Sequence, residues 1–308
     1  MPNLALPARP KTPPRRLAAL VLGAAALLAA CGGTPAPTST PTPTPSQPPT
    51  PAATLDPDAL EHATGAADVV LRISLQGGFM RLEYVMARVP LFTLFGDGRV
   101  LLVPPEGVEG PLAGGPAGVI AWPALREVRL TEAEIQDVLA YALAEGGLGV
   151  ARTEYAALIM DAPTTVFEIH AGGVDKTVRV NALAPDPEPG PDAAAMRAFS
   201  LLLGKLQSIS TAGDWAPDAY VAVIAETDPA GPPAPPWPWK DLAPAAFAQP
   251  AEADPVPFPS HLLTAAQLQA LGSVVDPGGA AGFRFTGPDG KAYIVAVRPA
   301  LPDEVAGG

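Results

Sequence analysis

Proline is the residue that most limits what this chain can fold into. Proline and glycine account for 41 and 30 of the 308 residues, together about 23% where roughly 12% is ordinary. Because proline fixes φ and has no amide N–H to donate, most of these residues must lie outside helices and inner strands. Many of the prolines lie in residues 32–57 and 228–259. The sequence therefore predicts two irregular segments that divide the chain.

The first 30 residues have the layout of an export signal. They hold four basic side chains and no acidic one, followed by 14 apolar residues from Leu17 to Ala30. Crossing a bilayer takes roughly 20 apolar residues, so this run is too short for a membrane span. A basic start and a short apolar run are typical of a secretory signal peptide. We therefore expect residues 1–30 to be a signal peptide.

The single cysteine follows that run directly. The sequence Leu28-Ala29-Ala30-Cys31 resembles a bacterial lipobox, which implies cleavage before Cys31 and lipid attachment to it. Several acyl chains give stable anchoring, because each buried CH₂ contributes about 0.8 kcal/mol. The alternative is a free thiol after a membrane helix, and the basic flank, run length and tetrapeptide together favour lipidation. We expect a lipoprotein of the cell membrane that faces outside the cytoplasm.

Residues 31–57 comprise Cys31 and a Pro/Thr-rich stretch that cannot bury a core. Such a segment favours extended polyproline II and reaches roughly 80 Å at most. A spacer is favoured over a Pro-rich ligand or an O-glycosylated stalk, because no basic or aromatic residue accompanies the prolines. Without residues 1–30 the net charge of −12 becomes −16. An anionic bilayer surface repels such an acidic domain.

The rest of the chain predicts an α+β fold with an antiparallel sheet of hairpins and about three packed helices. We expect a main domain at 58–227, a Pro/Trp-rich segment packed on the surface at 228–259, and a small helix-hairpin unit at 260–304. A first strand is expected at 69–75. Gly- and Asp-containing turns centred on 96–98, 171–175 and 287–290 predict three hairpins. No βαβ alternation is present, which argues against a Rossmann-like fold.

Three helices are expected. Thr131 and Glu134 form a capping box before an apolar stripe. A second helix begins at Asp192, and a short third one begins at Thr264. The residues expected to face inward from the second and third helices are Met196, Phe199, Leu203, Leu206, Leu268 and Leu271.

Two landmarks carry a resemblance to a known family. They are Trp237-Pro238 and the ending Arg298-Pro299-Ala300-Leu301-Pro302-Asp303-Glu304. A strand–Gly-Asp-Gly–strand hairpin before a Leu-Thr-capped helix accompanies them. Residues 65–304 are similar to an uncharacterised lipoprotein family of high-GC bacteria. Its motifs are structural, so the resemblance implies no activity and no catalytic residue.

The residues that could carry chemistry are scattered. The acidic charge argues against a nucleic-acid partner. One Cys excludes a disulfide scaffold and a thiolate zinc site, and His62, His170 and His261 lie about a hundred residues apart without an HExxH motif. No GxSxG, GxGxxG or GxxxxGK[ST] motif occurs. Helix-end and turn positions account for acids such as Glu132 and Asp97. We expect no metal, no cofactor and no catalytic residue.

Four aromatic residues form the candidate binding surface: Trp215, Tyr220, Trp237 and Trp239. Stacked rings of this kind hold sugars or extended peptides. The alternative is that they fix the Pro-rich segment to the core, and this is favoured because proline rings pack well on indoles.

These observations predict an exported, lipid-anchored surface protein with a non-catalytic binding or structural role in the cell envelope. Its partners would be the membrane, through the N-terminal lipid, and an envelope protein, peptide or glycan. The alternative is an envelope hydrolase, which needs two buried acids about 5–10 Å apart, one with a raised pKa. A solute-binding lipoprotein would need two α/β lobes, which this strand order does not supply.

Overall fold

The computed structural model describes eight stretches of the chain. They are residues 59–80, 82–104, 125–156, 159–211, 213–228, 234–248, 258–271 and 281–306. The predicted signal peptide, Cys31 and the predicted tether lie outside these residues. All of the described residues belong to one compact unit, Leu55–Gly308. Within the described residues, no helix combines the length and apolar character that a bilayer span requires.

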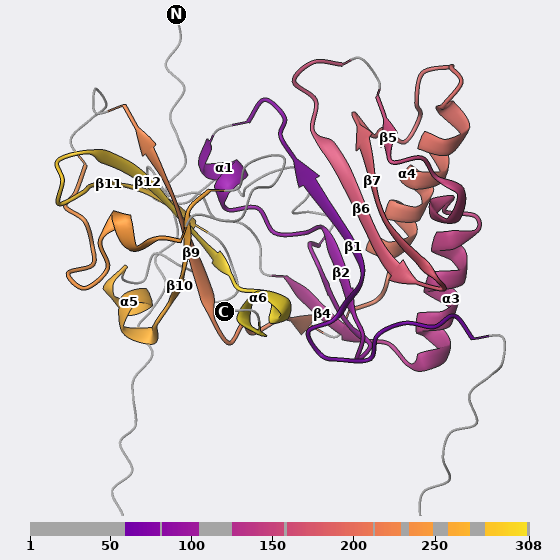
Figure 1. The fold of residues 1–308 in the computed structure, drawn as a ribbon, viewed down its shortest axis with the longest axis horizontal. Helices are drawn as coiled ribbons and strands as arrows, with labels where there is room; N and C mark the ends of the chain where they lie inside the picture. Colours follow the sequence, from indigo (N-terminus) through magenta and orange to yellow (C-terminus); the bar gives the residue numbers. More distant parts are fainter. Residues whose placement is uncertain are drawn as a thin grey trace, which may run out of the picture. The chain divides into compact units, whose positions relative to one another are not determined.

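Two sheets, both mainly antiparallel, form this unit (Figure 1), so the predicted α+β class is confirmed. The first sheet has the order β5-β7-β6-β1-β2-β3-β4-β8, in which only β5 and β7 pair in parallel. Its strands are β1 (Val69–Gln76), β2 (Phe92–Phe95), β3 (Arg99–Leu102), β4 (Arg126–Arg129), β5 (Glu154–Tyr155), β6 (Thr164–Ala171), β7 (Val174–Asn181) and β8 (Gly213–Asp214).

Two long helices cover one face of this sheet, α3 (Glu132–Leu143) and α4 (Ala193–Gln207). The predicted capping box starts α3, since the Thr131 amide donates to Glu134 Oε2 at 2.8 Å and the Glu134 amide donates to Thr131 Oγ1 at 3.4 Å. On α4, Met196, Phe199 and Leu206 are buried as predicted. Leu202 is fully buried as well, whereas the predicted Leu203 is half-buried, so one position of the predicted stripe is wrong.

The hairpin of β2 and β3 needs glycine at its turn. Gly98 has φ +83, and a Cβ atom there would lie 2.5 Å from the carbonyl oxygen of Leu130. The Leu130 amide donates to the Gly98 carbonyl at 2.8 Å. The predicted Gly-Asp-Gly turn thus also fixes the start of the segment that leads into α3.

The second sheet has the order β10-β9-β12-β11. Its strands are β9 (Tyr220–Thr227), β10 (Ser260–Leu263), β11 (Ala281–Thr286) and β12 (Ala292–Pro299), and the short helices near it are α1 (Leu82–Met86), α5 (Ala265–Ala270) and α6 (Pro302–Ala306). β9 lies at the end of the range 58–227 but pairs with β12 and β10. The second sheet therefore begins at Tyr220. On α5, Gln267 is buried together with Leu271, and Leu268 is half-buried.

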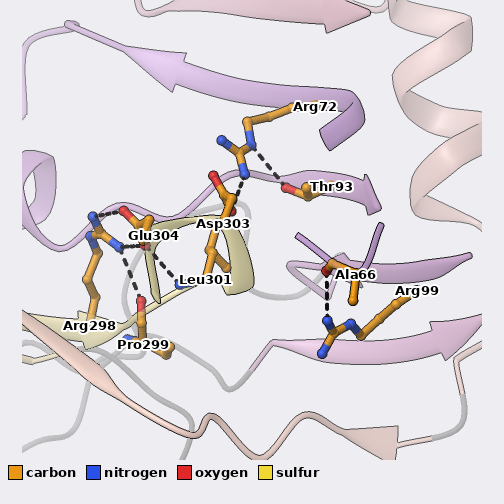
Figure 2. A network of polar contacts seen from close by, with 9 residues as sticks. All are labelled: Ala66, Arg72, Thr93, Arg99, Arg298, Pro299, Leu301, Asp303 and Glu304. Carbon is orange, nitrogen blue, oxygen red and sulfur yellow. Dashed lines mark hydrogen bonds and ion pairs between the residues drawn. The ribbon is translucent and has the colours of Figure 1, made fainter. Parts of the chain in front are cut away.

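The C-terminal ending, residues 298–304, joins the two sheets (Figure 2). Arg298, on β12, makes two bonds to the Glu304 carboxylate, at 2.6 and 2.8 Å. The next acid, Asp303, accepts from Arg72 Nη2 on β1 at 2.8 Å. Between them Leu301 is 2% exposed and packs in the apolar cluster with Phe95 of the first sheet. We name residues 298–304 the C-terminal clamp.

The turn of the third predicted hairpin makes the second sheet sensitive to alkali. Tyr293 donates its hydroxyl to Asp289 Oδ2 at 2.7 Å, and burial together with this bond raises the pKa of Tyr293 to about 12. A raised folded-state pKa gives stability that is present below about pH 10, the ordinary value, and is lost as pH rises through the folded value.

We therefore expect Tyr293→Phe to lower the free energy of unfolding at pH 8 and to lose this deficit as pH rises from about 10 to 12. Urea titrations of both proteins across that range would measure the difference. A difference that stays constant with pH would show that Tyr293 does not titrate with the raised pKa.

Candidate functional site

The four aromatic residues predicted as a binding surface lie in two separate clusters. Trp215 is 6% exposed and packs with Leu301 and Phe95 against the first sheet. Trp239 is 4% exposed in the core of the second sheet, where Tyr220 and Trp237 pack beside it. The structure therefore does not bring the four together on a surface.

The two tryptophans of the Pro/Trp-rich segment are fixed by their ring nitrogens. Trp237 Nε1 donates to the carbonyl of Leu242 at 2.6 Å, and Trp239 Nε1 donates to the carbonyl of Gln267 at 2.7 Å. Their ring centroids are 5.3 Å apart in an edge-to-face arrangement. The described part of the segment also bonds to β11 and β10 through the bridges Pro236↔Thr286 and Ala248↔Ser260. These contacts hold the segment on the second sheet.

Large apolar side chains are exposed at one end of the first sheet. Phe79 follows β1 and is 89% exposed, and Met160 precedes β6 and is 87% exposed. Their neighbours Met80 and Ile159 are also exposed. We name residues 77–80 and 159–163 the apolar loop pair. Single exposed apolar side chains are ordinary, but a group of them on adjoining loops is a feature of surfaces that bind a partner.

Specific contacts hold the two loops against each other. The Phe79 amide donates to the Asp161 carbonyl at 2.8 Å. Arg88 Nη1 donates to the Gly77 carbonyl at 2.8 Å. Gly78 lies against Pro163, so closely that a Cβ atom would come within 3.2 Å of its nitrogen. The loops are therefore positioned by bonds from several elements.

Two non-glycine residues of this region adopt left-handed backbone conformations, Asp161 with φ 68 and Ala182 with φ 52. Aspartate adopts this conformation in turns more readily than most residues. The Asp161 carbonyl accepts from the Phe79 amide, and the Ala182 amide donates to the Pro163 carbonyl at 3.0 Å, so both residues fix the path of the second loop.

A cavity of about 330 Å³, open to solvent, lies beside the loop pair. Its lining comes from four neighbouring strands and includes Gln76, Gly77, Glu154, Thr164, Arg179 and Asn181. Gln76, Thr164 and Asn181 are in register across β1, β6 and β7, and Glu154 is in register with Arg179. Arg179 Nη1 donates to Gln76 Oε1 at 2.6 Å. The cavity therefore offers one positive group, one negative group, two amides and a hydroxyl.

Carboxyl groups with a shifted pKa are stabilised in their charged form. The four in the described residues whose pKa departs clearly from its ordinary value all have it lowered: Glu132, Glu134, Asp289 and Glu304. For Glu304, burial acts to raise the pKa, but bonds and charge from Arg298, the Leu301 amide and the charge of Arg72 together outweigh it. A general acid of a hydrolase needs the opposite shift.

His62 and His170 lie close in the fold, since His62 forms a bridge with Ala171, but each has its own acidic neighbour. His62 Nε2 lies 3.2 Å from Glu132 Oε1, and His170 Nδ1 lies 3.0 Å from Asp175 Oδ1. His261 lies in β10 of the second sheet, where its ring is near Phe247. Within the described residues, no three His, Cys, Asp or Glu side chains are grouped to hold a metal ion.

Periodicity could not find the apolar loop pair, because its apolar residues belong to no helix or strand. A weaker signal was present. Phe79-Met80 follows two glycines, and Ile159-Met160 stands just before Asp161-Ala162-Pro163, so both pairs lie in segments rich in turn residues. Large apolar residues in such segments have no core to enter unless the loop folds back.

Three comparisons of the chain with known proteins gave no match, whether with family models, curated sequences or solved structures. Only the chain's own residues therefore indicate its function.

Proposed function

We propose that the protein is exported, is anchored to the cell membrane by lipid on Cys31, and binds an envelope partner outside the cytoplasm without catalysing a reaction. The basic flank, the short apolar run and the sequence Leu28-Ala29-Ala30-Cys31 support the anchor. The exposure of Phe79 and Met160 on two bonded loops supports the binding role.

Among the partner classes, a protein or peptide fits the described surface better than a glycan. Sugars are held by aromatic faces that are open to solvent, but Trp215, Trp239 and Tyr155 are buried. The Tyr155 ring is also occupied, by Arg152 on one side and Phe199 on the other. The exposed Phe79, Ile159 and Met160 suit apolar contact with a protein.

The anchor is tested by Cys31→Ser in the full chain. We expect this variant to accumulate as an unacylated precursor and to lose the added mass of the lipid, because the serine hydroxyl cannot replace the thiol in lipid transfer. Membrane fractionation and intact mass spectrometry would measure both effects, with Ser46→Ala in the tether as the matched control. Recovery of Cys31→Ser as a mature, acylated membrane protein would disprove the lipoprotein assignment.

A further inference from the structure

We propose that the apolar loop pair and its cavity bind an extended segment of a partner protein that carries apolar side chains together with lysine or arginine. The segment would bind at the end of the first sheet where β6 begins. This inference rests on the proposed binding role, and its chemistry comes from the loops and the cavity.

The chain arrives at the opposite end of the first sheet. The Leu60 amide donates to Gln136 Oε1 at 2.7 Å, and Gln136 Nε2 donates to the Leu60 carbonyl at 3.0 Å. His62 forms a bridge with Ala171, the last residue of β6, and the Gly172 amide donates to the Glu61 carbonyl at 2.8 Å. Hydrogen bonds therefore hold residues 60–62 beside the β6–β7 turn and α3.

The loop pair precedes the other end of β6. That strand runs from Thr164 beside the cavity to Ala171 beside the arriving chain. At about 3.3 Å per residue the two ends are roughly 23 Å apart. Phe79 and Met160 thus lie at the other end of β6 from residues 60–62.

The acidic balance of the chain favours a basic partner. Glu154 in the cavity and Asp161 in the loop pair are both exposed. Among the described residues beside them, Arg88 and Arg179 bond to neutral groups, the Gly77 carbonyl and Gln76 Oε1, so they retain their charge. The preference for a basic partner therefore comes from the net charge without residues 1–30, which is −16. An anionic bilayer would be repelled, whereas lysine and arginine would be attracted.

The cavity suits a polypeptide main chain. Gln76, Thr164 and Asn181 provide amide and hydroxyl groups in register across three strands, and such groups both donate and accept hydrogen bonds. A peptide main chain has the same mixture of donors and acceptors. Phe79 and the methionines would contact its apolar side chains, since methionine adapts its shape to varied partners.

The test uses the full chain, in phosphatidylcholine nanodiscs where it is acylated and in solution where it is not, and three fluorescein-labelled peptides of about twelve residues. These alternate Leu with Lys, Leu with Glu, and Ser with Lys. Fluorescence anisotropy, corrected with empty nanodiscs, should show the Leu–Lys peptide binding about tenfold or more tightly than the others. Phe79→Ser with Met160→Ser should weaken that binding about tenfold or more, as expected for central contacts.

The matched control is Val150→Ser, because Val150 is as exposed as Phe79 but lies in another part of the chain. It should leave binding unchanged, and both variants should melt within a few degrees of the parent. Equal binding by both variants, equal binding of all three peptides, or no binding would overturn the proposal. A vesicle experiment could also overturn the proposal. If phosphatidylglycerol vesicles sediment the Cys31→Ser protein, and Phe79→Ser with Met160→Ser abolishes this sedimentation, the loop pair binds the bilayer and not a peptide.

The two proposals can fail separately. Peptide binding is read from the loop variants and does not require acylation, whereas the anchor is read from the mass and location of the Cys31→Ser variant. Acylation without peptide binding would leave the anchor and reject the binding site. Peptide binding without acylation would do the reverse.

Discussion

Arg298→Ala is expected to lower the free energy of unfolding by about 2 kcal/mol. Removing one partner of a buried ion pair costs about 3–5 kcal/mol, because the other charge stays buried without compensation, and partial exposure reduces this figure. The side chains of Arg298 and Glu304 are 16% and 31% exposed. The pair is bidentate, and Glu304 also accepts from the Leu301 amide at 2.8 Å. Urea unfolding at pH 7 would measure the loss.

A double-mutant cycle separates the pair from its surroundings. Arg298→Ala combined with Glu304→Ala should cost less than the sum of the single variants, because each single change already breaks the same bonds. Arg298→Lys should be intermediate, since lysine keeps the charge but not the planar fork. Strict additivity would mean that the two side chains do not interact.

The same pair gives the protein an acid-side dependence with a definite sign. The pKa of Glu304 is lowered in the folded state. A lowered pKa gives stability that is present above the ordinary value near 4.5 and is lost as pH falls through the folded value. In Arg298→Ala this decline should be smaller, because the main cause of the lowered pKa is absent. If the free energy of unfolding of Arg298→Ala fell with decreasing pH as steeply as that of the parent, other carboxyl groups would cause the dependence.

Sequence predicted the parts of this fold that have local causes. Residues close together in the sequence determine the three hairpins and the helix caps at Thr131 and Thr264, and the structure contains all of them. The two-residue strands β5 and β8 have no such signal, because they exist only through pairing with distant strands. The separation of two sheets was missed for the same reason, since β9 is assigned by its contacts with β10 and β12.

The candidate site shows the same limit more strongly. The ending from Arg298 to Glu304 was noticed in the sequence, but its role depends on Arg72, which lies 231 positions away from Asp303. Phe79 and Met160 could be identified as binding residues only once their exposure and the bond between their loops were known. The tryptophans led to a wrong expectation for a different reason. Trp residues in a sequence are compatible both with an exposed surface that stacks on a ligand and with a buried core, so their presence alone does not decide between the two.

Trp239→Ala is expected to cost about 4 kcal/mol, the largest effect of the changes considered. Replacing a buried tryptophan by alanine removes apolar burial and leaves a cavity, at about 3–5 kcal/mol. Trp239 is 4% exposed, contacts the Trp237 ring and donates to the Gln267 carbonyl. Losing that donor also leaves a carbonyl near the end of α5 without its partner. Urea unfolding followed by circular dichroism would measure the cost.

Two further variants decide whether Trp239 is core or binding surface. Trp239→Phe should recover most of the loss but not the hydrogen bond, leaving a deficit of about 1 kcal/mol. Leu201→Ala is the matched control, because Leu201 is 60% exposed and such a change should stay within about 0.5 kcal/mol. If Trp239→Ala left unfolding unchanged but abolished retention on a peptidoglycan column, the ring would be an open glycan contact. Because an indole cannot be enclosed in the core and also stack on a sugar, that result would reject the burial of the Pro/Trp-rich segment and restore the glycan as a partner.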